Sequence, residues 1–382
     1  MNENCGRRGR HEMRILFAAR AMHRMAGGVE RMIATVMHAM VARGHEVDLL
    51  TWDLDGAEPF YPMPPSVRWH RLNLGDHERK AGVYHLLRRM MAVRKIVRRR
   101  RPQVIVSFQD GAFRALRAYA LGLGVPVVAA ERNAPTRFDH TKSGRKPPVI
   151  YNSFRLAKVV IIQCESYREL YPGYLHDRID TIPNPIFPTK SAANPDRPDS
   201  RNRFRLLSVG RLVYQKNYQS LITAFARLAG DFPDWELTII GEGEDRPKLE
   251  AMISAENLGA VVSLPGTTTA IDECYKGAHL FCLPSRWEGF PNVLGEAMAH
   301  CLPAVGFAGC AGVRDLVTPE QTGLLAAGNG DDESLAAALA RLMSDRQRRR
   351  VMGAAACDAI KPYAPDAIFD LWEETLRKAA KQ

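Results

Sequence analysis

The alternation of short apolar runs with helical segments and glycine turns constrains the fold of this chain more than any other feature. Residues 14–19 have the length and composition of a buried strand, and a Gly27-Gly28 turn follows them. Apolar residues then recur at helical spacing over residues 29–41, Gly44 ends that helix, and residues 47–51 form another strand-like run. Strand, glycine turn, helix and strand in this order predict a βαβ unit with parallel strands.

The same alternation continues along the chain in two series. Buried parallel strands are expected at residues 104–107, 126–130, 159–162, 205–210, 236–240, 261–264, 279–283 and 303–306, and helices at 218–228 and 247–255. The stretch 181–203 separates the two series and is rich in Pro, Asn, Asp, Arg and Ser, which is the composition of a linker. The pattern predicts an α/β protein with two doubly wound, Rossmann-like domains that face each other across a cleft, with ligands at the carboxyl ends of the strands.

The expected domain boundaries follow from these two series. We expect an amino-terminal domain at residues 13–185, a linker at 186–203, a carboxy-terminal domain at 204–362 and a final amphipathic helix at 363–382. No stretch approaches the roughly 20 apolar residues of a transmembrane helix, and the apolar run after Met13 is too short for a signal-peptide core. The protein is therefore expected in the cytoplasm, at most peripherally attached to the inner face of the cytoplasmic membrane.

Positive charge is concentrated in the first half of the chain. Residues 1–190 contain 32 Lys and Arg against 17 Asp and Glu, whereas the remaining residues contain 21 against 25. The run at residues 86–101 holds eight basic residues, no acidic residue, and apolar residues near helical spacing. Such a helix can lie on an anionic membrane surface, and its apolar stripe can also face its own sheet. Nucleic acid is a weaker alternative, because no recognition motif accompanies the charge.

The cysteines and two short motifs argue against a metal or a redox cofactor. The seven cysteines are odd in number and include no C-x-x-C pair, so we expect neither a disulfide framework nor a zinc site, and a reducing compartment fits. The Asp53-Leu54-Asp55 run follows an expected strand of the first domain and indicates a polar loop rather than a metal site. The Gly241-Glu242-Gly243 run lacks the third glycine of a dinucleotide fingerprint, which disfavours a nicotinamide enzyme.

The segment at residues 285–299 carries the strongest functional signal. It places Glu288 on an expected loop and Glu296 in an expected helix, with a Gly-Phe-Pro turn between them. The helix N-terminus would present free backbone N–H groups to a diphosphate, and carboxylates suit the hydroxyls of a sugar or a ribose. Arg211 and Lys216 follow an upstream strand and can neutralise a diphosphate. Each residue alone has a structural explanation, but together at strand ends they indicate a site for a sugar nucleotide.

These motifs resemble those of the family-4 retaining glycosyltransferases with the GT-B fold. The matching stretches extend over nearly the whole chain and are Gly27-Gly28-Val29-Glu30-Arg31, Gly210-Arg211 with Lys216-Asn217, Gly241-Glu242-Gly243, the Glu-x7-Glu pair at 288 and 296, and Gly323-Leu324-Leu325. The glutamate pair with the Arg/Lys pair is specific, whereas the Gly-Gly pair alone is weak. The resemblance implies a nucleotide-sugar donor in the carboxy-terminal domain, an acceptor on the amino-terminal domain, and a last helix that crosses back to the amino-terminal domain.

The resemblance also implies roles for individual residues. Glu288 would contact the transferred sugar, and Arg211 and Lys216 would stabilise the leaving diphosphate, which makes these three the expected catalytic residues. Glu296 would bind the ribose. The other expected donor-binding residues are Gly28, Glu242, Gly289, Phe290, Pro291, Asn292 and Val293. Retention in this family is described as a front-face reaction in which the leaving phosphate takes the proton of the acceptor, so catalysis would be mostly positioning and charge stabilisation.

One position departs from the family pattern. Many members have a histidine directly before a Glu-x-Asn-x-Pro stretch, and Ala130 stands there in this chain. Glu131, Arg132 and Asn133 are therefore the expected acceptor-side polar groups. His140 follows nearby and is expected to be a solvated loop residue rather than a catalytic one. The Glu-Arg-Asn run resembles the subgroup that builds exopolysaccharides, O-antigens and lipid-linked glycans.

We therefore expect a retaining hexosyltransferase that needs no metal and no cofactor. It would move a hexose or N-acetylhexosamine from a nucleotide diphosphate sugar, with UDP as the favoured nucleotide, to a membrane lipid-linked glycan acceptor in polysaccharide biosynthesis. A sugar-nucleotide epimerase on the same scaffold is the alternative enzyme, and it would act without an acceptor. A non-catalytic membrane- or nucleic-acid-binding protein is the other alternative, and the charged donor-side residues argue against it.

Overall fold

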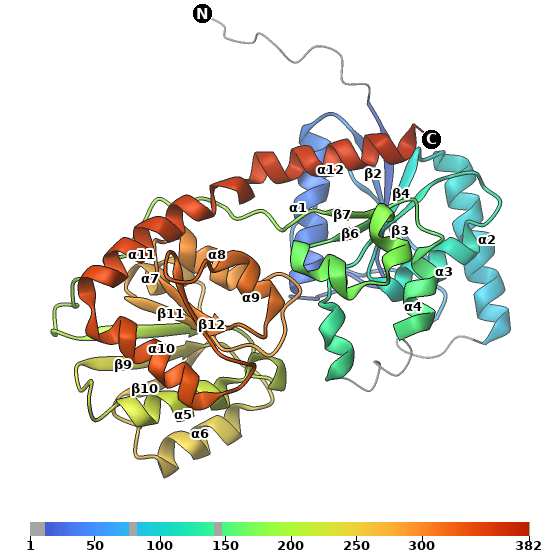
Figure 1. Cartoon of the computed structure of the whole chain (residues 1–382). Helices are drawn as coiled ribbons and strands as arrows, with labels where there is room; N and C mark the ends of the chain where they lie inside the picture. Colours follow the sequence, from blue (N-terminus) through green and yellow to red (C-terminus); the bar gives the residue numbers. More distant parts are fainter. Residues whose placement is uncertain (1–11, 76–81, 141–146, 382) are drawn as a thin grey trace, which may run out of the picture.

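Two α/β domains lie side by side in the computed structural model, which describes residues 12–75, 82–140 and 147–381 (Figure 1). Over these residues, the amino-terminal domain contains a seven-stranded parallel sheet in the order β3-β2-β1-β4-β5-β6-β7. Its strands are β1 (Arg14–Ala18), β2 (Glu46–Thr51), β3 (Arg68–Arg71), β4 (Val104–Phe108), β5 (Val127–Ala130), β6 (Val160–Ile162) and β7 (Ile179–Thr181). Its helices are α1 (Gly28–Ala42), α2 (Val83–Arg100), α3 (Asp110–Tyr119) and α4 (Pro147–Phe154), with short 3-10 helices η1 (Pro135–Asp139), η3 (Glu165–Leu170) and η4 (Gly173–Arg178).

The central strands of this sheet are covered on both faces. Successive side chains of a strand point to opposite sides of the sheet, so each of these strands contributes to two cores. In β1, Phe17 belongs to an apolar core that includes Ile33 and Met37 of α1. Its neighbour Leu16 belongs to a different core, which includes Val93 of α2 and Phe113 of α3. Because both faces of these strands are buried, their sequences are short and almost entirely apolar.

The carboxy-terminal domain repeats this plan. Over the described residues it is built on a six-stranded parallel sheet in the order β10-β9-β8-β11-β12-β13. Its strands are β8 (Phe204–Val209), β9 (Trp235–Ile240), β10 (Val262–Gly266), β11 (Leu280–Leu283), β12 (Ala304–Phe307) and β13 (Gly323–Ala326). Its helices are η5 (Tyr214–Lys216), α5 (Tyr218–Leu228), α6 (Arg246–Ala255), α7 (Ile271–Lys276), α8 (Asn292–Ala299), α9 (Ala311–Leu316), α10 (Asp332–Ser344), α11 (Arg346–Ala359) and η6 (Lys361–Tyr363), and α12 (Pro365–Ala380) closes the chain.

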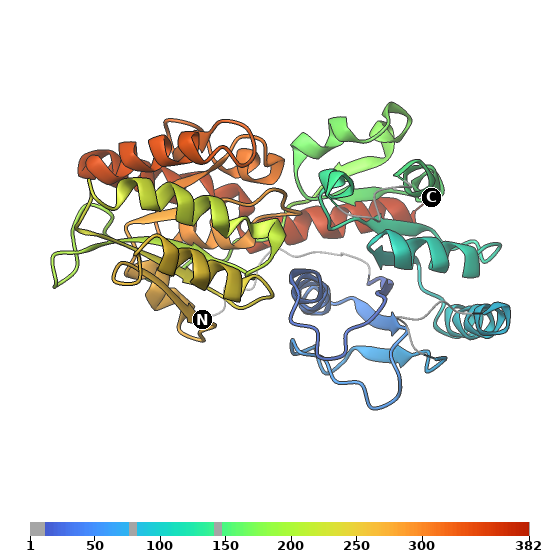
Figure 2. The same cartoon turned by 90° about the horizontal axis from the view of Figure 1, so that it is seen from below.

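The last helix returns to the amino-terminal domain, as Figures 1 and 2 show from two directions. Phe369, Trp372 and Leu376 of α12 are buried in the same core as β1 and α1. The Trp372 ring stacks on the Phe108 ring of β4 with 6.0 Å between the ring centroids. The two doubly wound domains and this crossing helix confirm the predicted fold class.

Both sheets reverse their strand order at one position, between β1 and β4 in the first domain and between β8 and β11 in the second. At such a switch point the connections leave in opposite directions, and a crevice forms at the carboxyl ends of the two strands. The loops that carry the expected donor residues follow β8 and β11, so the topology brings them to this point. Three strands, β3, β7 and β13, are present in addition to those that the sequence indicated.

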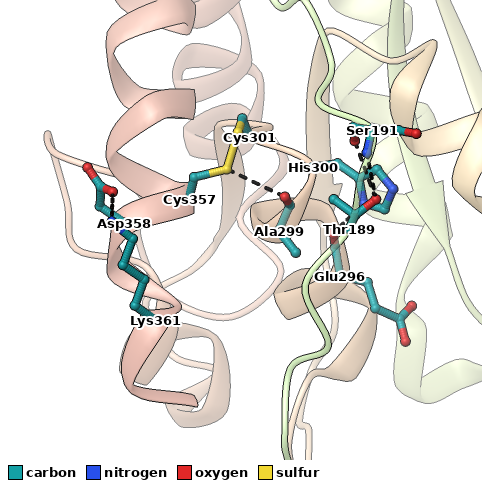
Figure 3. Close-up of a disulfide and its surroundings, with 9 residues drawn as sticks. All are labelled: Thr189, Ser191, Glu296, Ala299, His300, Cys301, Cys357, Asp358 and Lys361. Atoms are coloured by element: carbon teal, nitrogen blue, oxygen red, sulfur yellow. Dashed lines mark hydrogen bonds and ion pairs between the residues drawn. A yellow bond between two sulfur atoms is a disulfide. The ribbon is translucent and has the colours of Figure 1, made fainter. Parts of the chain in front are cut away.

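One disulfide corrects the expectation drawn from the cysteines. Cys301, which follows α8, is bonded to Cys357 of α11, 56 positions further along the chain (Figure 3). The two segments pack closely, since a Cβ at Gly353 of α11 would lie 2.2 Å from the Cys301 carbonyl oxygen. Sequence spacing carries no sign of this contact. Within the part of the chain that the structure describes, Cys164, Cys274, Cys282 and Cys310 are free, and Cys5 lies outside that part.

Candidate functional site

The loops after β8 and β11 lie beside each other because the two strands are neighbours in the second sheet. Gly210 and Arg211 follow β8, and η5 then places Lys216. The segment after β11 carries Glu288 on a loop and leads into α8, which contains Glu296. The loop and helix positions predicted for the two glutamates are thus the positions that they occupy.

Lys216 and Glu288 form a part-buried ion pair where these loops meet. The Lys216 Nζ donates to the Glu288 Oε1 at 2.6 Å, and the Ser285 hydroxyl donates to the same oxygen at 2.6 Å. The backbone carbonyl of Glu288 accepts a hydrogen bond from the Tyr167 hydroxyl of the amino-terminal domain. A carboxylate held by two donors has a fixed orientation, which suits it to recognise a ligand hydroxyl. Arg211 is exposed, and its guanidinium has no hydrogen-bond partner among the described residues.

Two glycines allow the loops after β8 and β9 to touch. Gly241 has a φ of +149°, and a Cβ there would lie 1.9 Å from the Gly210 carbonyl oxygen. A Cβ at Gly243 would lie 2.2 Å from the carbonyl oxygen of Leu212. Only glycine fits such an approach. Glu242, between the two glycines, is exposed and pairs with Arg246 of α6 at 2.7 Å.

Glu296 of α8 connects the two domains. Its Oε1 accepts a hydrogen bond from the Arg31 Nη2 of α1 at 2.7 Å, and its Oε2 accepts one from the Tyr275 hydroxyl at 3.1 Å. Burial alone would lower the pKa of Arg31, but the neighbouring Glu296 carboxylate outweighs burial and raises that pKa. Arg31, Asn292 and Glu296, together with residues 185–189, line a pocket of about 260 Å³ between the domains.

A chain of hydrogen bonds runs from the end of β5 to the start of α8. The buried Arg132 guanidinium donates to the Asn184 Oδ1, and the Asn184 amide donates to the Asn292 Oδ1 at 2.8 Å. Burial lowers the pKa of Arg132 to about 9. The start of α1 approaches the same point, since a Cβ at Gly28 would lie 3.6 Å from the Asn292 Nδ2. Arg132 thus lies between the domains and holds the linker, and its acceptor-side role stays a prediction.

Glu131 is the centre of a charged cluster beyond β5. Its Oε1 accepts hydrogen bonds from the Asn133 backbone and side-chain nitrogens, both at 3.0 Å, and from the Arg137 Nη1 at 2.9 Å. Arg137 also donates to Asp110 at 3.0 Å. Burial would lower the pKa of Arg137, but the Glu131 and Asp110 carboxylates outweigh burial and raise it. The Glu131 Oε2 is buried with no hydrogen-bond partner among the described residues, so the cluster holds this carboxylate through Oε1.

The turn between the two glutamates packs against the amino-terminal domain. A Cβ at Gly289 would lie 2.4 Å from the Arg132 carbonyl oxygen, so the two backbones touch here. Phe290 is buried in the largest apolar core, and Val293 packs against that core. Pro291 precedes the first residue of α8. These three side chains shape the turn, and their donor-binding roles stay predictions.

The Asp53-Leu54-Asp55 run is engaged in its own loop. The Asp53 carboxylate accepts a hydrogen bond from the Met22 backbone nitrogen at 2.9 Å, and the Asp55 carboxylate accepts one from the Asn73 side chain. Within residues 12–75, 82–140 and 147–381, no group of three or more His, Cys, Asp and Glu side chains is arranged to hold a metal ion. The interpretation of this run as a polar loop agrees with these contacts.

Several polar residues of the site were not singled out from the sequence. Arg31, Tyr275, Asn184, Ser285 and Arg137 each contact an expected site residue. Arg31 ends the Gly27–Arg31 motif, and that position was the available signal. Asn184 and Tyr275 have partners 108 and 21 positions away, which no local pattern indicates, whereas Ser285 and Arg137 lie within six positions of their partners and match no motif.

Comparisons with known proteins identify two glycosyltransferase domains in this chain. Residues 192–358 match the family model described as Glycosyl transferases group 1, and residues 27–185 match the Glycosyl transferase 4-like domain. The amylovoran biosynthesis glycosyltransferase of Erwinia amylovora is 23% identical, over 92% of this chain and 96% of that protein. A Campylobacter jejuni protein is 24% identical, over 91% of this chain and 94% of its own length, and is named a GalNAc-alpha-(1->4)-GalNAc-alpha-(1->3)-diNAcBac-PP-undecaprenol alpha-1,4-N-acetyl-D-galactosaminyltransferase.

Solved structures share the two-domain fold. Sucrose-phosphate synthase from Thermosynechococcus elongatus superposes with a TM-score of 0.78 at 20% identity, over 96% of this chain and 99% of the other. The Anabaena protein HepE in complex with UDP and glucose superposes with a TM-score of 0.76 at 19% identity, over 96% and 100% of the two chains. At these identities the likeness shows a common fold.

Proposed function

We propose that this chain, which belongs to the glycosyltransferases that join a glycosyltransferase 4-like domain to a group 1 domain, transfers a hexose or N-acetylhexosamine from a UDP-sugar to a lipid-linked glycan with retention of anomeric configuration. Glycosyltransferase activity in polysaccharide or lipid-linked glycan biosynthesis follows from the family match and from relatives aligned over more than 90% of this chain. The nucleotide, the stereochemistry and the lipid-linked acceptor make up the proposal.

The part-buried Lys216–Glu288 pair at the switch point of the second sheet carries this proposal. It sets a cation and an oriented carboxylate side by side, with the Lys216 Nζ 2.6 Å from the Glu288 Oε1 and the exposed Arg211 on the neighbouring segment. A sugar nucleotide has the same sequence of groups, with hydroxyls on the sugar next to an anionic diphosphate. The Arg31–Glu296 contact lies further along α8, where a carboxylate can receive the hydroxyls of a ribose.

The proposed reaction relies on positioning and charge. As the bond between sugar and phosphate breaks, negative charge grows on the diphosphate, and Arg211 and Lys216 would stabilise it without a metal ion. Glu288 would hold a hydroxyl of the transferred sugar, because its carboxylate is already oriented by Lys216 and Ser285. The leaving phosphate would accept the proton of the attacking hydroxyl on the same face of the sugar, which retains the configuration.

Two comparisons support the choice of donor and acceptor. The structure of Anabaena HepE contains UDP and glucose, and its fold extends over 96% of this chain. The name of the Campylobacter jejuni relative describes a glycan linked through a diphosphate to undecaprenol. A UDP-sugar and a lipid-linked glycan are therefore the first substrates to test.

We also propose that α2 holds the chain at an anionic bilayer surface, close to such an acceptor. The inward side of α2 buries Val93 and Val97 against the sheet. Tyr84, Leu87 and Met91 lie on its outward side and are exposed. Because residues three and four positions apart share one face of a helix, these three form an apolar strip along the first turns. The described helices include none that is both long enough and apolar enough to cross a bilayer.

The outward side of α2 becomes basic toward the end of the helix. Lys95, Arg98 and Arg99 are exposed, and none of them forms an ion pair with a residue that the structure describes. Arg100, by contrast, pairs with Asp48 of β2 at 2.9 Å. An exposed apolar strip that continues into unpaired cations matches the interface of an anionic bilayer, which offers acyl chains and phosphate groups side by side.

Isothermal titration with UDP and a donor hydrolysis assay test the proposed function. We expect UDP to bind with a Kd below the millimolar range and expect slow hydrolysis of one of UDP-glucose, UDP-galactose, UDP-N-acetylglucosamine or UDP-N-acetylgalactosamine. Lys216→Ala should weaken UDP binding and slow the hydrolysis, because it removes the part-buried cation. NMR of the product released first should show the anomeric configuration of the donor. Absence of UDP binding at millimolar concentration would refute the proposal, and a C-epimer of the donor sugar as the only product would favour the epimerase.

A further inference from the structure

We propose that His140, Tyr214 and Trp287 form an aromatic corner that binds a pyranose ring of the glycan acceptor by stacking. The His140 and Trp287 rings stack with 4.6 Å between centroids and an interplanar angle of 10°. Tyr214 lies at the edge of this stack, with its centroid 6.0 Å from that of Trp287 and 6.3 Å from that of His140. This inference rests on the proposed function, because it assigns the acceptor side of the same site.

The three rings lie on three segments of the candidate site, which follow β8, β11 and β5. Tyr214 begins η5, the 3-10 helix that ends in Lys216. Trp287 directly precedes Glu288, the partner of Lys216. The corner therefore lies next to the Lys216–Glu288 pair, where the proposed function puts the transferred sugar.

His140 connects the corner to the acceptor side. It follows η1, which begins four residues after Glu131 and contains Arg137, the residue that donates to the Glu131 carboxylate. The loop that carries the expected acceptor groups thus ends on the face of Trp287.

The backbone of the corner is fixed, and the His140 and Tyr214 rings are exposed, whereas Trp287 is partly buried against the apolar core and supports the other two rings. The Gln215 amide donates to the Trp287 carbonyl oxygen at 2.8 Å, and the Arg286 nitrogen donates to the Gln215 carbonyl oxygen at 2.9 Å. The Arg286 guanidinium covers the Tyr214 ring at 4.5 Å. Tyr214 nevertheless keeps 51% of its surface exposed, and His140 is exposed as well. Rigid segments that present exposed rings are suited to binding, because little conformational freedom is lost.

The chemistry of the corner indicates a sugar as its occupant. A pyranose ring has an apolar face of C–H groups and a rim of hydroxyls, so it can cover an aromatic face and donate to nearby acceptors. Aromatic rings supply large apolar contact area with a defined orientation. An acceptor glycan supplies both the apolar face and the rim of hydroxyls, whereas a lone lipid phosphate supplies neither.

Acceptor kinetics of Tyr214→Ala test the corner, with Tyr174→Ala as the matched control. Tyr174 is a tyrosine of similar exposure, 48%, and lies on η4 of the amino-terminal domain. With methyl glycosides of glucose, galactose, N-acetylglucosamine and N-acetylgalactosamine as acceptors, Tyr214→Ala should raise the acceptor KM roughly fivefold to tenfold, the effect of losing one stacked ring. The donor KM should rise by less than about the square root of that factor, which is roughly twofold to threefold. Tyr214→Phe should restore the acceptor KM, because it keeps the ring.

Saturation-transfer NMR with the same methyl glycosides keeps this test independent of the donor. We expect saturation of ring protons of at least one glycoside by the wild type and a loss of that signal in a His140→Ala, Tyr214→Ala, Trp287→Ala variant that retains its circular dichroism spectrum. Equal increases in acceptor and donor KM for Tyr214→Ala, or an unchanged NMR signal in the triple variant, would overturn the inference. A wild type that binds glycosides at the corner but not UDP would refute the proposed donor and leave the corner supported.

Discussion

The positions of single residues were predictable from the sequence where they depend on a local pattern. Glu288 and Glu296 stand on a loop and in a helix, as the spacing of the apolar residues around them predicted. Lys216 contacts Glu288 directly, which follows from the adjacency of β8 and β11. Arg31 remained hidden, because its partner Glu296 is 265 positions away in the sequence.

Substitution of Glu288 by glutamine tests whether its negative charge acts in catalysis. Gln is isosteric and keeps an oxygen to accept from Ser285, so the fold should persist. The turnover number should fall about 100-fold, the effect typical of losing one oriented electrostatic contact in a transition state. The Kd for UDP should change far less, because the expected partner of Glu288 is the sugar. Steady-state kinetics with calorimetry measures both, and equal losses would show that Glu288 holds the nucleotide instead.

Secondary-structure elements were predictable where their pattern was long and apolar. The helix expected at residues 218–228 coincides with α5, and most expected strands agree within two residues. β3 was missed because its sequence, Arg-Trp-His-Arg, is polar, as suits an edge strand that is only half buried. β7 was missed because it has three residues. The pairing of these strands comes from their neighbours in the sheet and not from their own sequence.

The basic end of α2 provides a prediction at the same scale. Neutralising Lys95, Arg98 and Arg99 to glutamine should weaken binding to vesicles with anionic lipid, since each cation near such a surface contributes about 1 kcal/mol. The three together should reduce the partition coefficient roughly 100-fold. Co-sedimentation with vesicles of phosphatidylcholine and phosphatidylglycerol measures the change.

The matched control for this experiment removes the same charge from the other domain. Arg227, Lys248 and Arg350 are exposed on helices of the carboxy-terminal domain, and their replacement by glutamine leaves α2 intact. We expect this variant to bind vesicles nearly as the wild type does. Equal weakening in both variants would show that net charge, and not the face of α2, causes the binding.

The disulfide between the end of α8 and α11 has a consequence for stability. A bridge that closes a loop of 56 residues restricts the unfolded chain, so Cys357→Ser should lower the free energy of unfolding by up to about 4 kcal/mol under oxidising conditions. Reductant should bring the wild type to the level of the variant. Urea denaturation measures both, with Cys274→Ser, a free and partly exposed cysteine, as the control. If reductant leaves the wild type unchanged, the two thiols are not bonded in solution.

At the scale of the whole molecule, the relative placement of the domains was beyond local patterns. The cleft followed from the presence of two parallel sheets, and the crossing of the last helix followed from family resemblance. The contacts that fix the domains against each other, Arg31 with Glu296 and Tyr167 with Glu288, join residues more than 100 positions apart. No periodicity or spacing encodes such pairs, since they depend on how two finished domains meet.

The Arg31–Glu296 bridge predicts how readily the domains separate. Arg31→Gln should raise the donor KM roughly fivefold, because a partly exposed ion pair contributes up to about 1 kcal/mol. It should also increase the radius of gyration measured by small-angle X-ray scattering without UDP. Arg24→Gln is the control, since Arg24 pairs with Glu58 inside one domain. A donor KM and a radius of gyration equal to those of the wild type would mean that the bridge does not hold the domains together.

The path of α12 affects how this chain can be synthesised. The core around β1 and α1 includes Phe369, Trp372 and Leu376, which leave the ribosome about 190 residues after β7 completes the first sheet. At a synthesis rate of roughly 5–20 residues per second, α12 is translated about 10–40 s after β7. During that time an apolar groove on the nascent chain faces solvent, which is the kind of surface that chaperones bind. Of these two domains, the amino-terminal one is translated before the other but completed after it.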